Sequence, residues 1–116
     1  MYKKSSEIKP DIRSNVRGGS GDVAFRHLFT KDELGGRIDL LAEITLEPGQ
    51  SIGVHPHETN GEAYYICQGS VTVTEDDESR VLSVGDAEFC ADGHSHSIRN
   101  HTDKIAKFLA VIVSNR

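Results

Sequence analysis

Nine short apolar runs, separated by residues that favour turns, constrain the fold of this chain more than any other feature of its sequence. Within the runs the apolar period is two and not 3.6: in DLLAEITL, residues 39–46, every second residue from Leu40 to Leu46 is apolar. No long segment shows helical spacing. Many short strands separated by turns are typical of an antiparallel sandwich or barrel, so we expect an all-β fold.

The predicted strands follow one another from residue 23 to residue 113. They are VAFRHLFT (23–30), DLLAEITL (39–46), SIGVHPH (51–57), EAYYIC (62–67), SVTVTE (70–75), RVLSV (80–84), AEFCA (87–91), HSIRN (96–100) and KFLAVIV (107–113). In the last strand both alternating sets of residues are apolar, which predicts burial on both faces. One face would meet the core and the other a second sheet or a partner subunit, so we expect a homodimer.

The remaining residues come first in the chain and have a different composition. Residues 1–22 are polar and glycine-rich and end in RGGSGD, which is typical of an arm or loop. A length of 116 residues fits one domain. We therefore predict an N-terminal arm or loop of residues 1–22 and a single domain of residues 23–116.

The net charge and the cysteine content limit which binding partners and which cell compartment we expect. A net charge of −5 with scattered basic residues argues against nucleic acid and against an anionic membrane surface. No apolar run is long enough to span a bilayer, and the start of the chain lacks the apolar stretch of a secretory signal. Cys67 and Cys90 are too few for a disulfide framework and are expected to be small buried side chains. We expect a cytoplasmic protein.

Four residues that commonly ligate metals are placed so that they can converge. His55 and His57 project from the same face of a strand, and Glu62 follows a glycine-bearing loop that can reverse the chain. His96 lies on a later strand. Neutral imidazole and carboxylate groups suit Mn(II), Fe(II), Ni(II), Cu(II) and Zn(II). Taken alone, a His-x-His pair is more often an ordinary polar strand face, so the wider spacing has to decide between the two interpretations.

That wider spacing resembles the two sequence motifs of the cupin superfamily. From Gly49 the chain reads GQSIGVHPHETNGEAYYICQG: Gly, five residues, His, one, His, four, Glu, six, Gly, as in the first motif. From Gly85 it reads GDAEFCADGHSHSIRN, which is similar to the second motif, although Ala91 stands where that motif normally has proline. Because proline presets its own φ, this change concerns the geometry of a loop and removes no histidine or glutamate.

The resemblance implies both a fold and a metal site. The implied fold is a double-stranded β-helix, or jelly-roll barrel. The implied ligands of one divalent transition metal ion per chain are His55, His57, Glu62 and His96. Mn or Fe is favoured over Ni, Zn or Cu. Four protein ligands leave two positions on an octahedral ion, which water, O2 or a chelating carboxylate of a small-molecule ligand or substrate could take.

Four further residues are candidates for the pocket around the ion. His94 is either a proton donor or shuttle, or a plain loop histidine. Tyr64 and Ile66 share strand parity with Glu62, and core packing is the alternative for both. Phe89 is expected to line the barrel.

The resemblance also implies a class of function. Small cupins of this layout, with the glycine-rich lead-in VRGGSGD, look similar to the oxalate decarboxylase-like group. We therefore expect an enzyme that acts on a small carboxylate or other O-donor substrate by decarboxylase- or dioxygenase-like chemistry, or an isomerase. The alternative is a module that binds or senses a small ligand without turnover.

The catalytic acid or base is not identified by the sequence. The loop DELGG, residues 32–36, is the candidate position for a proton-donating carboxylate. Arg26, Arg37 and Arg99 are the arginines considered for holding a substrate carboxylate, and parity turns Arg99 away from the His96 face.

Overall fold

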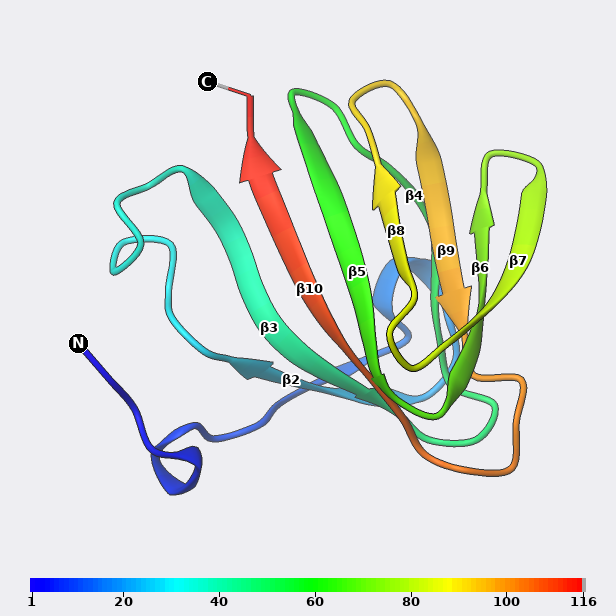
Figure 1. Ribbon diagram of the computed structural model, residues 1–116, viewed down its shortest axis with the longest axis horizontal. Helices are drawn as coiled ribbons and strands as arrows, with labels where there is room; N and C mark the ends of the chain where they lie inside the picture. Colours follow the sequence, from blue (N-terminus) through cyan, green and yellow to red (C-terminus); the bar gives the residue numbers. More distant parts are fainter. Residues whose placement is uncertain (116) are drawn as a thin grey trace.

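The computed structural model describes residues 1–115, and each of the nine predicted strands is present in it (Figure 1). The elements, in chain order, are η1 (Ser5–Glu7), β1 (Asp11–Ser14), η2 (Val16–Gly18), β2 (Asp22–His27), β3 (Ile38–Leu46), β4 (Ser51–Pro56), β5 (Asn60–Gln68), β6 (Ser70–Glu75), β7 (Glu78–Ser83), β8 (Ala87–Cys90), β9 (Ser95–Arg99) and β10 (Ala106–Ser114). Arg116, the last residue of the predicted domain, lies outside the described residues.

The strands form two antiparallel sheets. One sheet has six strands in the order β1-β2-β3-β10-β5-β8, and the other has four in the order β4-β9-β6-β7. The two sheets curve around a shared interior, as Figure 1 shows. Strands that are neighbours in space are often distant in the chain, as β10 is from both β3 and β5. This arrangement is the predicted jelly roll.

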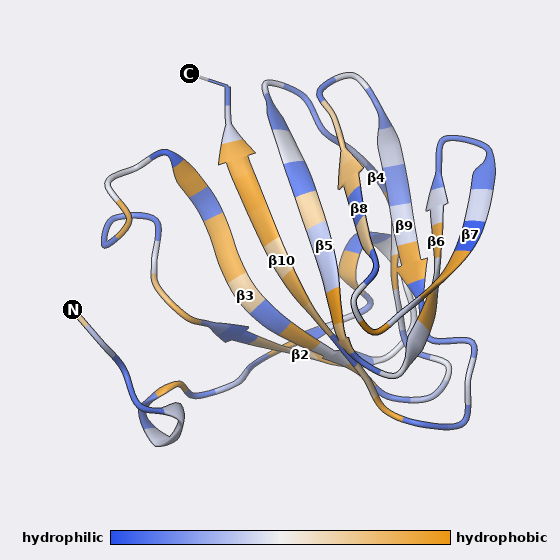
Figure 2. Cartoon of the chain, viewed as in Figure 1, coloured by the Kyte–Doolittle hydropathy of each residue, from blue (hydrophilic) through white to orange (hydrophobic). Residues whose placement is uncertain are grey.

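β10, one of the two central strands of the larger sheet, is apolar on both faces, and Figure 2 shows it as the most uniformly hydrophobic strand in that view. The predicted burial on both faces is found on the inner face alone, since Val111 on the outer face is half-buried and Val113 is exposed. On its inner face Phe108 and Ala110 are fully buried. On its outer face Leu109 stands opposite Glu43 of β3 and Tyr65 of β5. The inner face therefore packs into the core, while the outer face of the sheet faces away from it.

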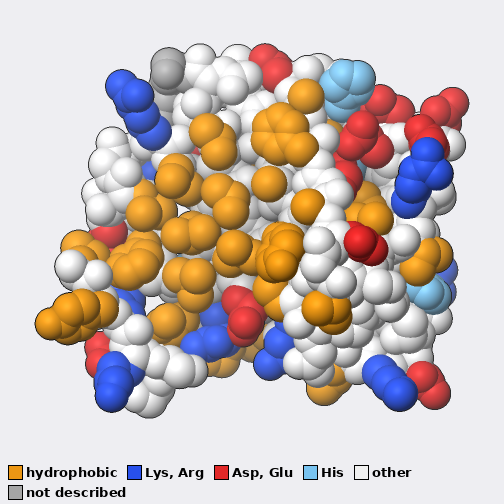
Figure 3. All heavy atoms as spheres, in the orientation of Figure 1, with side chains coloured by type: hydrophobic (Ala, Val, Ile, Leu, Met, Phe, Trp, Pro, Cys, Tyr) orange, Lys and Arg blue, Asp and Glu red, His pale blue; other side chains and the backbone are white. Residues whose placement is uncertain are grey.

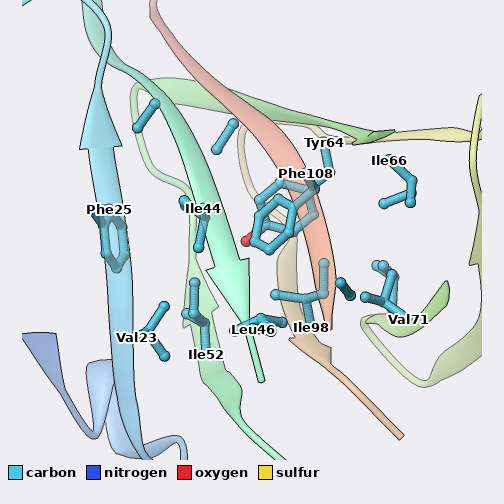
Figure 4. Close-up of a cluster of buried hydrophobic side chains, with 14 residues drawn as sticks. Val23, Phe25, Ile44, Leu46, Ile52, Tyr64, Ile66, Val71, Ile98 and Phe108 are labelled. Atoms are coloured by element: carbon cyan, nitrogen blue, oxygen red, sulfur yellow. The ribbon is translucent and has the colours of Figure 1, made fainter. Parts of the chain in front are cut away.

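The hydrophobic core lies between the two sheets (Figure 4). Its largest fully buried apolar side chains are Phe108, Ile44, Leu46, Ile66, Ile98, Val23 and Val71. Tyr64 adjoins them, with its ring edge-on to that of Phe108 at 4.8 Å between centroids. Each fully buried aliphatic or aromatic side chain contributes about 1.5–3 kcal/mol through removal from water, so this cluster accounts for much of the folding free energy.

The first 22 residues contain structure that the sequence pattern did not predict. Residues Asp11–Ser14 form β1, which pairs with β2 although all four are exposed. The apolar periodicity cannot reveal such a strand, because it is held by backbone hydrogen bonds at a sheet edge and not by burial. The division into an arm of residues 1–22 and a domain of residues 23–116 stays a prediction.

Among the described residues the helices are two 3-10 turns of three residues each, so none has the length needed to cross a bilayer.

Candidate metal centre

The four predicted metal-ligating residues meet between the sheets, and both sheets contribute. The smaller sheet provides His55 from β4, His57 directly after it and His96 from β9, and the larger sheet provides Glu62 from β5. Opposite β9, β4 has an irregular register between Ile52 and His55, and it lies at the edge of its sheet. The exposed Pro56 between the two histidines is compatible with this position, because an edge strand tolerates a residue without an N–H.

The side chains converge on one oxygen atom. Glu62 Oε1 lies 3.3 Å from His55 Nε2, 3.1 Å from His57 Nε2 and 2.9 Å from His96 Nε2. The Nε2 atoms of His57 and His96 are 3.1 Å apart. None of the four residues is more than 5% exposed. The cluster is therefore compact and buried.

The outward nitrogen of each imidazole has an oxygen partner. His55 Nδ1 is 2.8 Å from the Gly53 carbonyl oxygen, and His57 Nδ1 is 2.8 Å from Asn60 Oδ1. His96 Nδ1 is 3.0 and 3.1 Å from the two carboxylate oxygens of Glu88. A carbonyl or carboxylate oxygen can only accept, so Nδ1 donates a proton and Nε2 is the nitrogen that faces the cluster.

The electrostatics of the cluster favour positive charge at its centre. Burial by itself would raise the pKa of Glu62, but hydrogen bonds with His55, His57 and His96 outweigh burial and hold that pKa well below its usual range. Burial lowers the pKa of His96, but its hydrogen bonds with Glu62 and Glu88 outweigh this and raise it to about 9. A buried carboxylate ringed by three imidazoles therefore attracts a proton or a metal cation.

The donor set fits a divalent transition metal ion. With Nδ1 protonated, three neutral imidazoles direct their Nε2 lone pairs toward each other and toward an anionic oxygen, which is repulsive without a cation among them. Protonating all three would instead crowd three positive charges into one buried site. The atoms that these residues offer to a metal all lie within 4.8 Å of one another. One ion in contact with all four donors relieves the repulsion, and imidazole and carboxylate are ligands that such ions prefer.

A cavity of about 320 Å³ opens over the cluster. The residues that line it are Arg13, Val16, Arg17, Phe25, His27, Asp39, Leu40, Ile44, Ile52, His55, Pro56, His57, Asn60, Glu62, Tyr64 and Ile112. The two arginines come from the N-terminal segment, which thus forms part of the wall. The volume is at the small end of the usual range for small-molecule sites.

Comparison of the sequence with known protein families shows which family contains this arrangement of residues. The cupin domain family matches residues 42–112, more than half of the chain and including all four residues of the cluster. The chain is a cupin.

Two relatives extend the comparison over nearly the full length. An oxalate-binding protein of Thermotoga maritima is 40% identical over 113 residues, which are 97% of this cupin and 93% of the relative. A crystal structure described as a predicted oxalate decarboxylase, also from Thermotoga maritima, is 39% identical with a TM-score of 0.95, covering 98% of this chain and 99% of its own. A third relative, a crystal structure from Thermus thermophilus, covers less of the chain. It is 32% identical, with a TM-score of 0.72 over 79% of this chain and 83% of its own.

Of the four further pocket candidates in this cupin, Tyr64 alone lines the cavity. Its ring stacks on that of His96, with 4.6 Å between centroids and 8° between planes. Burial raises the pKa of the Tyr64 hydroxyl well above its usual range, and the nearby Glu62 adds to this. Tyr64 therefore presents a neutral phenol beside the cluster. Ile66 is fully buried in the apolar core.

The other two candidates lie outside the cavity. His94 is half exposed, and its Nδ1 is 2.7 Å from Asp76 Oδ2 at the surface, which raises the pKa of His94. Phe89, expected to line the barrel, is 55% exposed and lies on the outer face of β8. The expectation for Phe89 is corrected by the register of β8, in which Tyr64 stands opposite Glu88 and Ala63 opposite Phe89. Glu88 therefore points inward, in place of the neighbouring Phe89.

Sequence reasoning missed the residue that contacts His96 from behind and the two arginines of the cavity. Glu88 was overlooked because a carboxylate on a strand is normally exposed unless it has a partner, and its partner lies in the other sheet. Arg13 and Arg17 lie in residues 1–22, which the sequence pattern predicts to be an arm or loop. The three arginines considered from the sequence, Arg26, Arg37 and Arg99, do not line the cavity, and neither does the loop of residues 32–36.

The N-terminal segment reaches the cavity because two glycines allow a close backbone approach. A Cβ on Gly53 would lie 2.1 Å from the Arg17 carbonyl oxygen, and a Cβ on Gly19 would lie 2.2 Å from the Ser51 carbonyl oxygen. Arg17 itself has a left-handed backbone, with φ of 54°. Non-glycine residues in this region cost about 1–3 kcal/mol and occur often at ligand sites. Gly53, two residues before His55, thus positions Arg17 at the cavity.

Proposed function

We propose that this cupin binds a small dicarboxylate of the oxalate class at one divalent transition metal ion held by His55, His57, Glu62 and His96. The observation that carries the proposal is one cavity in which this donor set and two arginines meet. Mn or Fe is the favoured ion, because a site that combines imidazoles, a carboxylate and an O-donor ligand suits both. The bound ion supplies positive charge and open coordination positions for carboxylate oxygens.

Arg17 supplies the second positive charge. It is exposed at the cavity, and no hydrogen bond or ion pair to it occurs within residues 1–115. Arg13, in contrast, donates from Nε to Asp11 Oδ2 at 2.9 Å and stacks on the Phe25 ring at 4.8 Å. Arg17 is therefore available to pair with a ligand carboxylate, while Arg13 is held in place by Asp11 and Phe25. A negative net charge of −5 makes this local concentration of positive charge the steering element for an anion.

The apolar wall of the cavity strengthens these contacts. Val16, Phe25, Leu40 and Ile52 line the cavity beside the charged groups. Apolar surroundings lower the local dielectric constant, so that an ion pair between a carboxylate and a guanidinium gains strength relative to water. The relative that is 40% identical is an oxalate-binding protein, which supports the same class of ligand.

Calorimetric titration tests the proposal. Elemental mass spectrometry should find about one Mn or Fe per chain, and oxalate should bind the metal-loaded protein but not the chelator-treated protein. Arg17→Gln should weaken oxalate binding about 10–100-fold, because a charged hydrogen bond contributes about 1.5–3 kcal/mol. Arg99→Gln removes the same charge from an exposed residue away from the cavity and should leave oxalate binding unchanged. Equal binding with and without metal would overturn the assignment.

Turnover of the same ligand, by decarboxylase- or dioxygenase-like chemistry, is the second candidate function. An acid–base catalyst must lie within reach of the substrate and differ from the metal ligands. His27 lines the cavity, and its Nε2 is 3.4 Å from Asp11 Oδ2, which favours it for this role. Product formation from oxalate, or O2 uptake with a panel of dicarboxylates, thiols and catechols, would support turnover. Loss of that activity in His27→Gln with unchanged oxalate affinity would identify the residue.

The outer face of the six-stranded sheet supports the proposal of a homodimer. Exposed and half-buried apolar side chains gather on this face, and Figure 3 shows them as a broad hydrophobic area. The members with at least 41% exposure include Ile12, Tyr65, Phe89 and Val113, and Val111 of β10 lies on the same face. A second copy that covers this face would produce a dimer in light scattering. Val111→Asp should yield monomers, whereas Val81→Asp on β7 should not; a monomeric parent protein would exclude the dimer.

The cytoplasm is the proposed compartment. Cys90 is buried as expected, but Cys67 is exposed, so the expectation of burial is wrong for Cys67; neither forms a disulfide within residues 1–115. An exposed thiol persists where the environment is reducing. Fractionation of cells that express the protein, with a known cytoplasmic and a known secreted marker, tests this placement.

A further inference from the structure

Glu88 contacts the cluster of histidines and Glu62 through His96, and it does not line the 320 Å³ cavity that opens over the cluster. Its side chain is 11% exposed, and both carboxylate oxygens lie within hydrogen-bond distance of His96 Nδ1, at 3.0 and 3.1 Å. The His96 side chain is completely buried. This contact bridges the two sheets, because Glu88 is on β8 and His96 is on β9.

The three imidazoles of the cluster differ in their outer partners. His55 donates to a backbone carbonyl and His57 to the amide oxygen of Asn60, both of which are neutral groups. His96 alone among the three donates to a carboxylate. A negative charge on the Nδ1 side makes the Nε2 lone pair a stronger donor to a cation, and the fork of two oxygens restricts rotation of the ring.

A second contact restricts the same imidazole. The Tyr64 ring lies parallel to His96, at 8° and 4.6 Å between centroids. The tyrosine thus fixes the plane of the imidazole, and Glu88 fixes its rotation within that plane. His55 and His57 have no such stacked partner among the described residues, since their ring contacts are with other members of the cluster at steep angles.

The carboxylate also has its own surroundings, which are separate from the ligand cavity. Glu88 lines a second cavity of about 280 Å³ together with Val73, Glu75, Glu78, Arg80, Leu82, Ala87 and Phe89. Glu75, which stands opposite His96 on β6, interacts with Glu88, and this neighbouring carboxylate raises the pKa of Glu75. Glu88 therefore cannot reach a ligand in the cavity over the metal, and any effect it has on binding must pass through His96.

We propose that Glu88 is a positioning residue, which holds His96 with Nδ1 protonated and Nε2 directed at the metal and so raises the affinity of the site. The inference rests on the proposed metal site but not on the identity of the dicarboxylate. It goes beyond the four ligands by assigning a role to a residue in a separate cavity.

Metal affinity and one NMR signal test the proposal together. Mn(II) binding, measured by electron paramagnetic resonance and calorimetry, should weaken about 10–100-fold in Glu88→Ala. Glu88→Gln keeps an oxygen that accepts from Nδ1 but loses the charge, and should fall between Glu88→Ala and the parent protein. The proton on His96 Nδ1 should give a downfield resonance that is protected from exchange in the parent protein and in Glu88→Gln. This resonance should be absent in Glu88→Ala.

Glu78→Gln is the matched control, because Glu78 lines the same cavity without a contact to His96. It should retain the affinity and the resonance of the parent. A purely structural role of Glu88 would lower the unfolding temperature of Glu88→Ala without changing its affinity for Mn(II), and this result would overturn the proposal. If Mn(II) binding depends on Glu88 but oxalate does not bind, the positioning role stands and the dicarboxylate function fails. If the parent protein binds no Mn(II), both fail.

Discussion

The interior of the barrel has an apolar half and a polar half, and the same strands build both. On β5, Ile66 lies in the apolar half and Glu62 in the polar half, while on β9 the same relation holds between Ile98 and His96. All four residues are at most 3% exposed. Burial and strand parity are therefore equal in the two halves. Core residues and cluster residues follow the same alternation along each strand. They differ only in the type of side chain.

The two halves differ in what they need for stability. The apolar half is stabilised by removal of its side chains from water and requires nothing further. The polar half holds a buried carboxylate and three imidazoles, which cost free energy unless a proton or a cation compensates them. Tyr64 lies at the boundary, edge-on to Phe108 and stacked on His96. Three predictions test this division.

The largest effect on stability should come from the apolar half. Phe108→Ala should lower the free energy of unfolding by about 3–5 kcal/mol, because truncation of a buried aromatic ring loses transfer free energy and leaves a cavity. Denaturation in urea with and without metal measures the change, which should be the same in both conditions. A loss below about 1 kcal/mol would contradict the idea that this half carries the stability. His57→Ala, in the polar half, should cost the metal-free protein much less.

Metal should stabilise the protein through the polar half. Mn(II) at a thousand times its dissociation constant should add about 4 kcal/mol to the free energy of unfolding, since a ligand that binds only the folded state stabilises it by mass action. The increment should disappear in His57→Ala and persist in Phe108→Ala. Thermal unfolding with Mn(II) and with a chelator measures it. An increment of the same size in His57→Ala would place the metal elsewhere.

The smallest effect is a dependence of the metal-free stability and of the metal affinity on pH. The pKa of His96 is raised from 6.5 to about 9. Because the folded pKa is the higher one, the contribution of His96 to metal-free stability is fully present below about pH 6.5 and is lost as the pH rises through about 9. The same proton competes with a metal ion, so the apparent metal affinity should rise about tenfold per pH unit between pH 7 and about 9. Competition with a chromophoric chelator measures the slope, and a flat profile would exclude His96 as a ligand.

Much of the fold could be predicted from local pattern. The nine apolar runs correspond to β2 through β10, because alternation of apolar residues reflects burial of one strand face. β1 escaped prediction since all its residues are exposed and only a neighbouring edge holds it. The parity of β8 was wrong for a related reason. An isolated strand offers two faces, and the pairing with β5 selects the face that carries Glu88.

Local spacing also predicted the cluster of three histidines and Glu62, but the cavity around it depends on distant segments. His55, His57 and Glu62 lie on two consecutive strands and the loop that joins them, so their relation follows from a short stretch of chain. Arg17 reaches the cavity because Gly19 and Gly53 let two backbones approach closely. Nothing in the pattern of residues 1–22 indicates that contact.

By itself the sequence determined the all-β class, the strands of the barrel and the four-residue cluster, since strand period and motif spacing are local properties of the chain. The tertiary structure alone decided that Glu88 lies behind His96 and that two arginines from the N-terminal segment line the same cavity as His55, His57 and Glu62. These contacts join residues from different sheets or distant segments. Their free energy depends on partners in space, and the period of a single strand carries no information about which partner that is.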